Sequence, residues 1–354
     1  MMSKYRFDQI AYNITEKKKP TEEDKYTYIG LEHLDSGNLE VTRYGSDVAP
    51  IGEKLIMKEG DVLFGKRRAY QKKVAIAPFD GIFSAHGMVL RPKEEVIDKS
   101  FFPFFISSDY FLDAAIKISV GSLSPTINWR DLKELEFELP DMEKQRKLAK
   151  VLWAIEGTKR SYQKLLLKTD ELVESQFIEM FGKIDDIGKF PRKQWSEVLQ
   201  IINGRDHKPV ADPNGEYPVY GSGGLMGRAT DYLCPENTVV MGRKGTIDKP
   251  YVVTEKFWNV DTAFGVVPNR EILHYLYLLW YCKQLDYTKL NKASTLPSTT
   301  KDDLLKLSIN VPPIELQEQF AAFVRQCDKS KLELEQALTE LDATYRKIIS
   351  DNLG

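Results

Sequence analysis

The chain has 354 residues, of which 42% are hydrophobic, and this is enough for two ordinary domains with a core each. Its formal charge of −2 at pH 7 excludes a globally basic protein, so any contact with nucleic acid has to come from local clusters. The 3 cysteines are too few and too scattered for a disulfide framework, and no apolar run is long enough to predict a membrane span or a signal peptide. We therefore expect a cytoplasmic protein whose cysteines are buried thiols.

The first predicted domain, residues 1–140, consists of short β-type runs broken by glycine and proline. These runs are KYTYIG at 25–30, DVLFG at 61–65, KVAIA at 73–77 and GMVL at 87–90. One helical-looking apolar segment follows at 101–116. Such a mixture predicts an α+β fold with a largely antiparallel sheet.

Within this domain, the segment GDVLFGKRRAYQKK at 60–73 places cations directly after an apolar run. We interpret Gly65 as a residue that lets the chain turn sharply, so that the turn projects positive charge from a strand end. Arginine pairs with O6 and N7 of guanine and lysine contacts phosphate, so the turn predicts a contact with nucleic acid. The candidates here are Lys66, Arg67, Arg68, Tyr70, Lys72 and Lys73. A solvated hairpin turn is the alternative.

Next comes the joint, the segment that connects the first domain to a long helix. The alternating stretch LEFELP at 135–140 predicts a strand, and its last residue, Pro140, suits the start of a helix. Apolar residues then recur at alternating spacings of four and three, which predicts a coiled-coil spacer helix over 141–182. About 40 residues at ~1.5 Å each give a helix of ~60 Å, too exposed to stay ordered alone.

The second half repeats this order, with a domain predicted at 183–312. Its β-type runs are YPVYG at 217–221, TVVMG at 238–242, PYVV at 250–253 and FGVV at 264–267. The segment NTVVMGRKGTIDKP at 237–250 echoes the cationic turn, and the glycine-rich YGSGGLMGR at 220–228 suits a phosphate backbone or a plain flexible loop. The candidates in this half are Ser222, Arg228, Arg243, Lys244 and Lys249. The aromatic segment 271–285 resembles a base-stacking platform, but its apolar residues go round a helix, which favours the core.

The phrase SLSPTINWRDLKELEFELPDMEKQ at 122–145 recurs 172 positions later, at 294–317, as STLPSTTKDDLLKLSINVPPIELQ. The same offset continues through a second helix predicted at 313–354, so the chain is an internal repeat. The predicted helix seam consists of Leu148, Leu152, Ile155, Tyr162, Leu166 and Val173 in the first helix and of Phe320, Val324, Leu334, Leu338 and Tyr345 in the second.

Motifs for catalysis are missing from the sequence. The 4 histidines show no paired-ligand spacing, no GxSxG motif occurs, and NVPPI at 310–314 departs from the NPPY motif of adenine methyltransferases. GDVLFGKR approaches a phosphate-binding loop, but a β-type run fills its interior and Arg67 stands where serine or threonine should be. We expect no metal and no cofactor. The alternatives left open are a single-chain nuclease or methyltransferase with unrecognised catalytic residues, and a coiled-coil scaffold that binds only proteins.

These phrases resemble the specificity subunit of type I restriction-modification systems along essentially the whole chain. The likeness rests on the repeated joint phrase, on YPVYGSGG, VVMGRKGTI and FWNVDTAFGVV in the second half, and on KYTYIGLEHLDSG in the first. The second copy departs slightly, with LPST where the first has LSPT and no counterpart of Trp129.

The resemblance implies two target-recognition domains, each reading half of a split site in double-stranded DNA and held apart by two antiparallel helices. It also implies docking of two methyltransferase subunits and of restriction subunits that translocate and cleave, so that this chain catalyses nothing itself. A helix of ~60 Å against ~3.4 Å per base pair bounds the spacing of the half-sites at roughly 17 base pairs.

Overall fold

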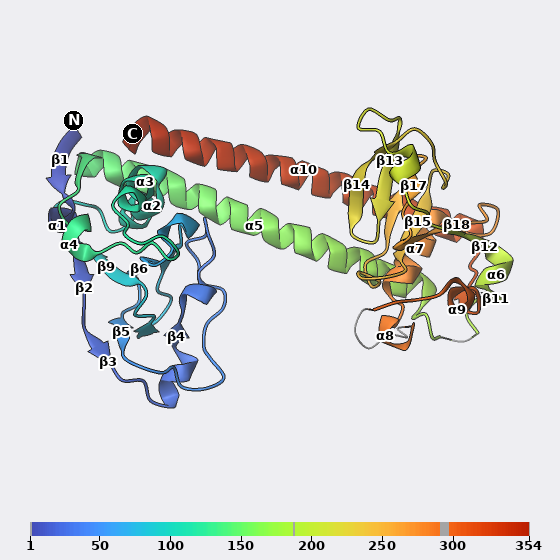
Figure 1. The fold of residues 1–354 in the computed structure, drawn as a ribbon, viewed down its shortest axis with the longest axis horizontal. Coiled ribbons are helices and arrows are strands. Elements are labelled where there is room, and N and C mark those ends of the chain that lie inside the picture. The colour runs from blue at the N-terminus through green and yellow to red at the C-terminus, as the bar shows by residue number, and fades with distance from the viewer. Residues whose placement is uncertain (1, 187, 291–296, 354) are drawn as a thin grey trace. The chain divides into compact units, whose positions relative to one another are not determined.

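A computed structural model describes residues 2–186, 188–290 and 297–353 of the chain. By their contacts the residues form two compact units: unit 1 is Met1–Tyr162 with Ala337–Gly354, and unit 2 is Gln163–Gln336. Each unit contains part of two long helices, α5 (Met142–Phe181) and α10 (Ile314–Leu353) (Figure 1). The division into four domains at the helix ends therefore stays a prediction. Of the repeated phrase, residues 294–296 lie outside the described residues.

Unit 1 is built from short strands and helices that precede α5 (Figure 1). Its strands are β1 (Met2–Arg6), β2 (Ala11–Ile14), β3 (Lys17–Lys18), β4 (Tyr28–Ile29), β5 (Lys54–Met57), β6 (Val62–Phe64), β7 (Val74–Ile76), β8 (Gly81–Phe83), β9 (Met88–Pro92) and β10 (Glu136–Pro140). Its short helices are α1 (Phe7–Ile10), α2 (Phe102–Ser107), α3 (Asp109–Lys117) and α4 (Trp129–Leu132).

Unit 2 follows the same plan. Its strands are β11 (Arg192–Gln194), β12 (Leu199–Asn203), β13 (Tyr217–Gly221), β14 (Gly224–Ala229), β15 (Thr238–Gly242), β16 (Tyr251–Val253), β17 (Trp258–Asn259), β18 (Ala263–Pro268) and β19 (Ser308–Asn310). Its short helices are α6 (Trp195–Val198), α7 (Tyr275–Lys283), α8 (Tyr287–Leu290) and α9 (Lys301–Leu305).

Two sheets of each unit correspond strand for strand, whereas the third has the order β3-β5-β8-β4 in unit 1 and β14-β13-β17 in unit 2. The order β2-β9-β6-β7 in unit 1 matches β12-β18-β15-β16 in unit 2, and the pair β1-β10 matches β11-β19. All these pairings are antiparallel, whereas β4 with β8 and β13 with β17 pair in parallel in the remaining sheets. The predicted fold class, two mixed domains with an internal repeat, is confirmed.

Aromatic residues dominate both cores. In unit 1, Phe111 packs against the rings of Phe7 and Phe137, with centroids 5.0 and 5.5 Å away. In unit 2, the ring of Tyr277 on α7 stacks on Phe177 of α5 at 5.5 Å, and its hydroxyl donates to the Asn310 carbonyl. Tyr277 is 1% exposed, so the core interpretation of segment 271–285 is confirmed over the stacking platform.

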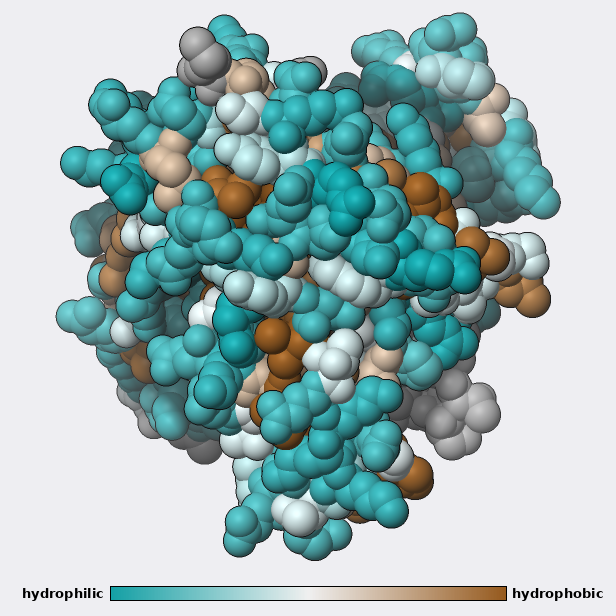
Figure 2. All heavy atoms as spheres, turned by 90° about the vertical axis from the view of Figure 1, so that its left-hand side faces the viewer, coloured by the Kyte–Doolittle hydropathy of each residue, from teal (hydrophilic) through white to brown (hydrophobic). Residues whose placement is uncertain are grey.

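The surface drawn in Figure 2 is mostly hydrophilic, and hydrophobic residues show there as small separate areas. The three cysteines are buried free thiols, as expected. Across the described residues, no helix is long and apolar enough to cross a membrane.

The two long helices run antiparallel within each unit and share its core. In unit 1, Leu152 of α5 and Ile349 of α10 belong to one hydrophobic cluster. In unit 2, the rings of Phe177 on α5 and Phe320 on α10 lie 5.4 Å apart. The other predicted seam residues are all buried or half-buried in the structure: Leu148, Ile155, Tyr162, Leu166, Val173, Val324, Leu334, Leu338 and Tyr345.

Each helix carries one lysine in the seam, and the two lysines occupy equivalent positions. Lys159 contacts Asp342 at 2.7 Å in unit 1, and Lys331 contacts Asp170 in unit 2. Burial opposes the charge of Lys159, but hydrogen bonds to Asp342 and Glu156 raise its pKa overall. Its ammonium group also lies over the Tyr345 ring.

A buried glutamine fixes the start of each long helix. The Gln145 side chain donates to the Pro140 carbonyl (2.8 Å) and the Val96 carbonyl (3.2 Å), and it accepts from the Asp98 amide (2.8 Å). Gln317 repeats this pattern with the Pro312 and Ile272 carbonyls and the His274 amide, at 2.8, 3.0 and 2.8 Å. Gln145 is 1% exposed and Gln317 is fully buried, so each amide replaces water for three backbone groups.

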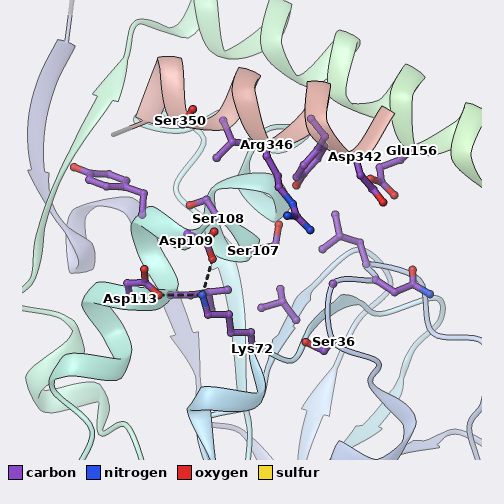
Figure 3. Close-up of a pocket in the computed structure, with 18 of the residues that line it drawn as sticks. Ser36, Lys72, Ser107, Ser108, Asp109, Asp113, Glu156, Asp342, Arg346 and Ser350 are labelled. Atoms are coloured by element: carbon purple, nitrogen blue, oxygen red, sulfur yellow. Dashed lines mark hydrogen bonds and ion pairs between the residues drawn. The ribbon is translucent and has the colours of Figure 1, made fainter. Parts of the chain in front are cut away.

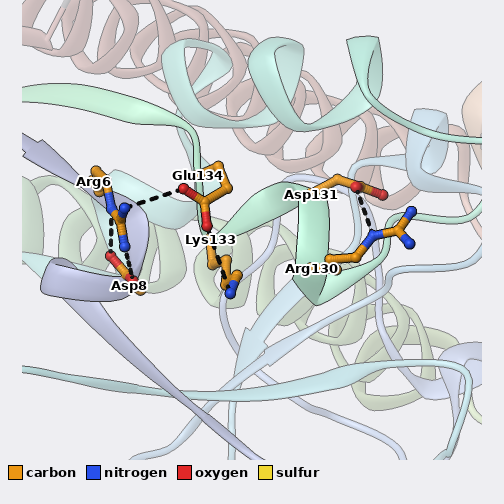
Figure 4. Close-up of polar contacts among 6 residues, drawn as sticks. All are labelled: Arg6, Asp8, Arg130, Asp131, Lys133 and Glu134. Carbon is orange, nitrogen blue, oxygen red and sulfur yellow. Dashed lines mark hydrogen bonds and ion pairs between the residues drawn. The ribbon is translucent and has the colours of Figure 1, made fainter.

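The strand before each helix is fixed by a second repeated contact. The Phe7 amide donates to the Leu135 carbonyl at 2.8 Å, and the Trp195 amide donates to the Leu307 carbonyl at 2.8 Å. Around the first of these joints, Arg6 pairs with Asp8 and Glu134 (Figure 4). These ion pairs are exposed and contribute little, so the backbone bonds and the buried rings hold the joint.

Replacing Gln145 with leucine is expected to lower the free energy of unfolding of unit 1 by about 1–3 kcal/mol, because three buried backbone groups lose their partner. Urea unfolding followed by circular dichroism measures the change. Lys150→Leu, at an exposed position on the same helix and in the same unit, is the control and should shift stability by less than about 0.5 kcal/mol. Equal effects of both changes would contradict the anchoring role.

His274 is expected to make unit 2 sensitive to acid. Its Nδ1 accepts from the Leu276 amide at the start of α7, and burial, with a smaller effect of Arg325, lowers its pKa from 6.5 to about 4. As the pH falls from about 6.5 towards 4, the unfolded chain binds a proton here that the folded chain excludes, so stability decreases.

His274→Asn keeps a capping oxygen and removes the titration, so the stability of this variant should fall less steeply over that pH range. Unfolding midpoints measured from pH 8 to pH 4 test this. At pH 8 the two proteins should be similar, and parallel pH profiles would contradict the assignment.

Candidate nucleic-acid interface

The cationic turn of unit 1 joins β6 to β7 and is held on both sides by backbone hydrogen bonds. The Arg67 amide donates to the His86 carbonyl at 3.2 Å. The Arg68 amide donates to the Pro125 carbonyl at 2.7 Å, and the Ile127 amide donates to the Lys66 carbonyl at 3.0 Å. The turn is therefore clamped between the loop before β9 and the first residues of the joint phrase.

Unit 2 holds its cationic turn in the same way. The Lys244 amide donates to the Thr262 carbonyl at 3.3 Å, which corresponds to the bond between Arg67 and His86. The Gly245 amide donates to the Pro297 carbonyl at 3.1 Å, and the Thr299 amide donates to the Arg243 carbonyl at 3.0 Å.

Pro125 and Ile127 lie 172 positions before Pro297 and Thr299, so the repeated phrase carries the cationic turn in both units. This contact was not predicted from the sequence. The sequence does contain a signal for it, because the repeated phrase begins at Ser122, well before the strand at 135–140 and the helix that follows.

The glycine that opens each turn has a different role from the one expected. Gly65 and Gly242 do not have positive φ angles. A Cβ at Gly242 would lie 1.9 Å from the Thr246 carbonyl oxygen, and one at Gly65 would lie 3.2 Å from the Lys73 Cβ. Gly242 is required because two chain segments approach closely, whereas Gly65 only relieves a tight contact, and neither residue has the left-handed backbone that a sharp turn at glycine uses.

A left-handed residue comes three positions later in each turn, and the first turn has a second one at Lys72. Arg68 has φ 55°, and its counterpart Gly245 has φ 81°. A residue with a Cβ pays about 1–2 kcal/mol for this conformation, whereas glycine does not. Unit 1 thus keeps an arginine where the backbone favours glycine, which points to a role for the side chain outside the fold.

The cations at the tip of the first turn are free of carboxylates. Arg67 and Arg68 are exposed, Lys66 is half-buried, and none of them takes part in an ion pair among the described residues. Burial and, to a smaller extent, the nearby charge of Lys17 lower the pKa of Lys66. The positive cluster therefore includes Lys17, which was not among the residues predicted from the sequence. Arg67 also lies 3.4 Å from the His86 ring nitrogen, and Tyr70 is 56% exposed.

Two further candidates of unit 1 have other partners. The Lys72 ammonium pairs with Asp109 at 2.6 Å and Asp113 at 3.0 Å, beside a pocket of about 830 Å³ (Figure 3). Hydrogen bonding to Asp109 raises the pKa of Lys72, and its charge is neutralised locally. Lys73 donates to the Leu31 carbonyl at 2.6 Å. Both stay predictions as DNA contacts, but they stabilise the fold.

In unit 2, the candidate residues divide in the same manner. Lys244 and Lys249 are exposed and form no ion pair within the described residues, and the Arg243 guanidinium lies 5.9 Å from the Phe264 ring centre. Arg228, in contrast, donates to the backbone carbonyls of Gly215 and Glu216 and thereby holds the β13–β14 hairpin.

The glycine-rich loop lies next to the second cationic turn. Ser222 is at the tip of the hairpin, and its amide lies 3.5 Å from the Thr262 hydroxyl. A Cβ at Gly245 would lie 3.7 Å from the Ser222 hydroxyl oxygen. The structure therefore brings Ser222 together with Arg243 and Lys244, which the sequence had placed in separate motifs.

Nothing in the site indicates bond-making chemistry. Among the described residues, no three histidine, cysteine or carboxylate side chains gather as metal ligands. The free groups are cations, backbone amides and an aromatic ring, which suit binding to a polyanion.

Replacing Arg68 with glycine is expected to stabilise unit 1 by about 1 kcal/mol, because the left-handed conformation then costs nothing, and to weaken binding to duplex DNA. Chemical unfolding and fluorescence anisotropy measure the two effects. Arg67→Gly is the control: its φ is not positive, so it should lose affinity without gaining stability. A destabilised Arg68→Gly variant would contradict the strain.

Comparisons with known proteins show the family that this chain is similar to. Residues 7–167 and 189–341 match the family model described as type I restriction modification DNA specificity domain. The chain is 24% identical over 391 residues to a putative type I restriction enzyme MjaX specificity subunit from Methanocaldococcus jannaschii, covering 95% of this chain and 87% of that protein. It is 25% identical over 207 residues to the EcoDI specificity subunit from Escherichia coli, covering 57% of this chain and 45% of that protein.

Solved structures show the same fold. The type I restriction-modification S subunit from M. genitalium aligns over 100% of this chain and 96% of its own, with a TM-score of 0.64 and 14% identity. A chain from a study of assembly and conformational transition of a type I R-M system aligns over 99% and 97%, with a TM-score of 0.63 and 19% identity.

Proposed function

The chain belongs to the family of type I restriction modification DNA specificity domains, and from this premise we propose that it selects the DNA site for a type I restriction-modification enzyme. One observation carries the proposal. The same cationic turn, with exposed cations that form no ion pair, is fixed to the same repeated phrase in both units. Two equivalent reading surfaces suit a site in double-stranded DNA that is split into two half-sites.

Each half-site is assigned to one unit. Arg67 and Arg68 contact bases of one half-site, and Arg243 and Lys244 contact bases of the other. Arginine at such a tip discriminates guanine by about 1–3 kcal/mol per bidentate pair. The half-buried Lys66 and the amides of the glycine-rich loop near Ser222 hold phosphates and set the register.

The long helices serve as the docking surface for partner subunits. Val151, Leu165 and Leu172 of α5 are 47%, 50% and 51% exposed, although they are apolar. They recur at multiples of seven residues, so they follow one side of the helix outside the seam. This supports docking of a methyltransferase subunit on α5. By the internal repeat we propose two such subunits, with the restriction and translocase subunits joining that assembly.

The chain itself carries out no reaction in this proposal. Methyl transfer to the target base, and its extrusion from the helix, belong to the partner subunit. The chain works in the cytoplasm, where its DNA is. If the purified chain alone methylated or cut DNA in the presence of magnesium and a methyl donor, the alternative of a single-chain enzyme would replace it.

Replacing Arg67 with alanine is expected to relax base preference in one half-site only, and Arg243→Ala should relax the other, because the two cations lie in different units. Methylation sequencing in a host that carries the chain and its partner subunits identifies the altered positions. Lys99→Ala, which removes an exposed charge from unit 1 away from the turn, is the matched control. An equal loss for all sequences would mark the two arginines as phosphate contacts.

A further inference from the structure

A small preformed tip stands beside the cationic turn of unit 1. Val120 and Thr126 exchange both backbone hydrogen bonds, at 3.0 and 2.9 Å, and so close the short loop 121–125. Gly121 has φ 113°, which a residue with a side chain rarely adopts, and the Thr126 hydroxyl donates to the Ser124 carbonyl at 3.1 Å. The loop is thereby held in one conformation from inside.

The tip is tied directly to the arginines. Thr126 forms an antiparallel bridge with Arg67, and the Pro125 carbonyl accepts from the Arg68 amide. Any surface that binds these two arginines also meets the tip, because backbone bonds fix the distance between them.

The tip presents a leucine to solvent. Leu123 is 92% exposed, and Val120 at the base of the loop is 64% exposed. Single exposed apolar residues are common and need no explanation by themselves. Leu123 differs because its loop is fixed to cations without carboxylate partners, so the apolar side chain belongs to a surface that suits a polyanion.

We propose that Leu123 is a specificity-determining residue, an apolar wedge that inserts at a base step of the half-site bound by unit 1. This inference rests on the proposed function. Leucine is among the side chains that unstack base steps and kink a duplex, and the nearby Arg67 and Arg68 would hold phosphates that the bend brings closer. Base steps differ in the cost of unstacking, so the wedge selects sequence without a hydrogen bond to a base.

The test uses the chain assembled with the methyltransferase subunits of its own system and a duplex that contains the mapped site. A fluorophore pair at the duplex ends reports bending by energy transfer, and anisotropy reports affinity. Leu123→Ala is expected to lose roughly tenfold in affinity for the site and to abolish the bend, with an unchanged salt dependence, because no charge is removed. Leu123→Met keeps an apolar side chain of similar reach and should retain the bend.

The matched control is Ile51→Ala, which truncates an apolar residue of unit 1 that is 94% exposed and forms no bridge to the turn. It should leave affinity and bending unchanged. If Leu123→Ala binds and bends DNA like the unmodified chain, the proposal is wrong. A loss of affinity with an unchanged bend would also overturn the wedge and indicate a contact such as that with a thymine methyl group. Failure of the unmodified assembly to bind DNA would instead refute the proposed function.

Discussion

The buried amide of Gln145, and that of Gln317 in the second copy, is the interaction on which the rest depends. Each side chain satisfies a carbonyl five residues earlier and two backbone groups of the preceding domain, so one residue connects strand, helix and domain core. An unpaired backbone group in such a buried place costs about 1–3 kcal/mol. The direction in which α5 and α10 leave their domains is therefore set by a polar contact, with apolar packing added to it.

The same repeated phrase serves a second purpose at its other end. Its Pro125 and Pro297 accept hydrogen bonds from the cationic turns, so the segment that anchors a helix also fixes the candidate reading surface. A turn held on both sides can keep cations exposed and without carboxylate partners, as DNA contacts require. It can also hold Arg68 in a strained conformation, because the surrounding backbone bonds over-determine it. The same backbone hydrogen bonds therefore account for the rigidity of the turn and for cations that stay without carboxylate partners.

The sequence alone predicted those elements in which apolar residues recur with a short period. Most of the predicted strands, the long helices and the segments around 101–116 and 271–285 follow from spacings of two, 3.5 and 3.6 residues, and the 172-residue repeat gave the overall plan. The sequence did not predict the short strands of unit 1 (β1, β2, β3, β5 and β8) or of unit 2 (β11, β12, β14 and β17), and the predicted run 25–30 is a strand only at β4. Contacts between distant segments leave no such signal. Nothing near Lys72 or Arg228 in the sequence indicates that Asp109 neutralises the first or that the Gly215 carbonyl holds the second. For the same reason the glycines of the cationic turns were assigned to turning when they allow close approach.

The ion pairs of the helix seam show why the repeat is preserved in polar residues as well as in apolar ones. Lys159 with Asp342 and Lys331 with Asp170 are the same pair under the 172-residue offset, once in each unit. A leucine in place of either lysine would pack as well or better, since a partly buried ion pair gains little net stability. An apolar seam, however, tolerates a shift by one heptad. Such a shift would place Lys159 and Lys331 opposite Ile349 and Phe177 in one direction, and Lys331 opposite Gln163 in the other, so at least one ion pair is lost either way. The two pairs therefore specify one register of α5 against α10. That register also fixes the helix end at which each glutamine anchor forms.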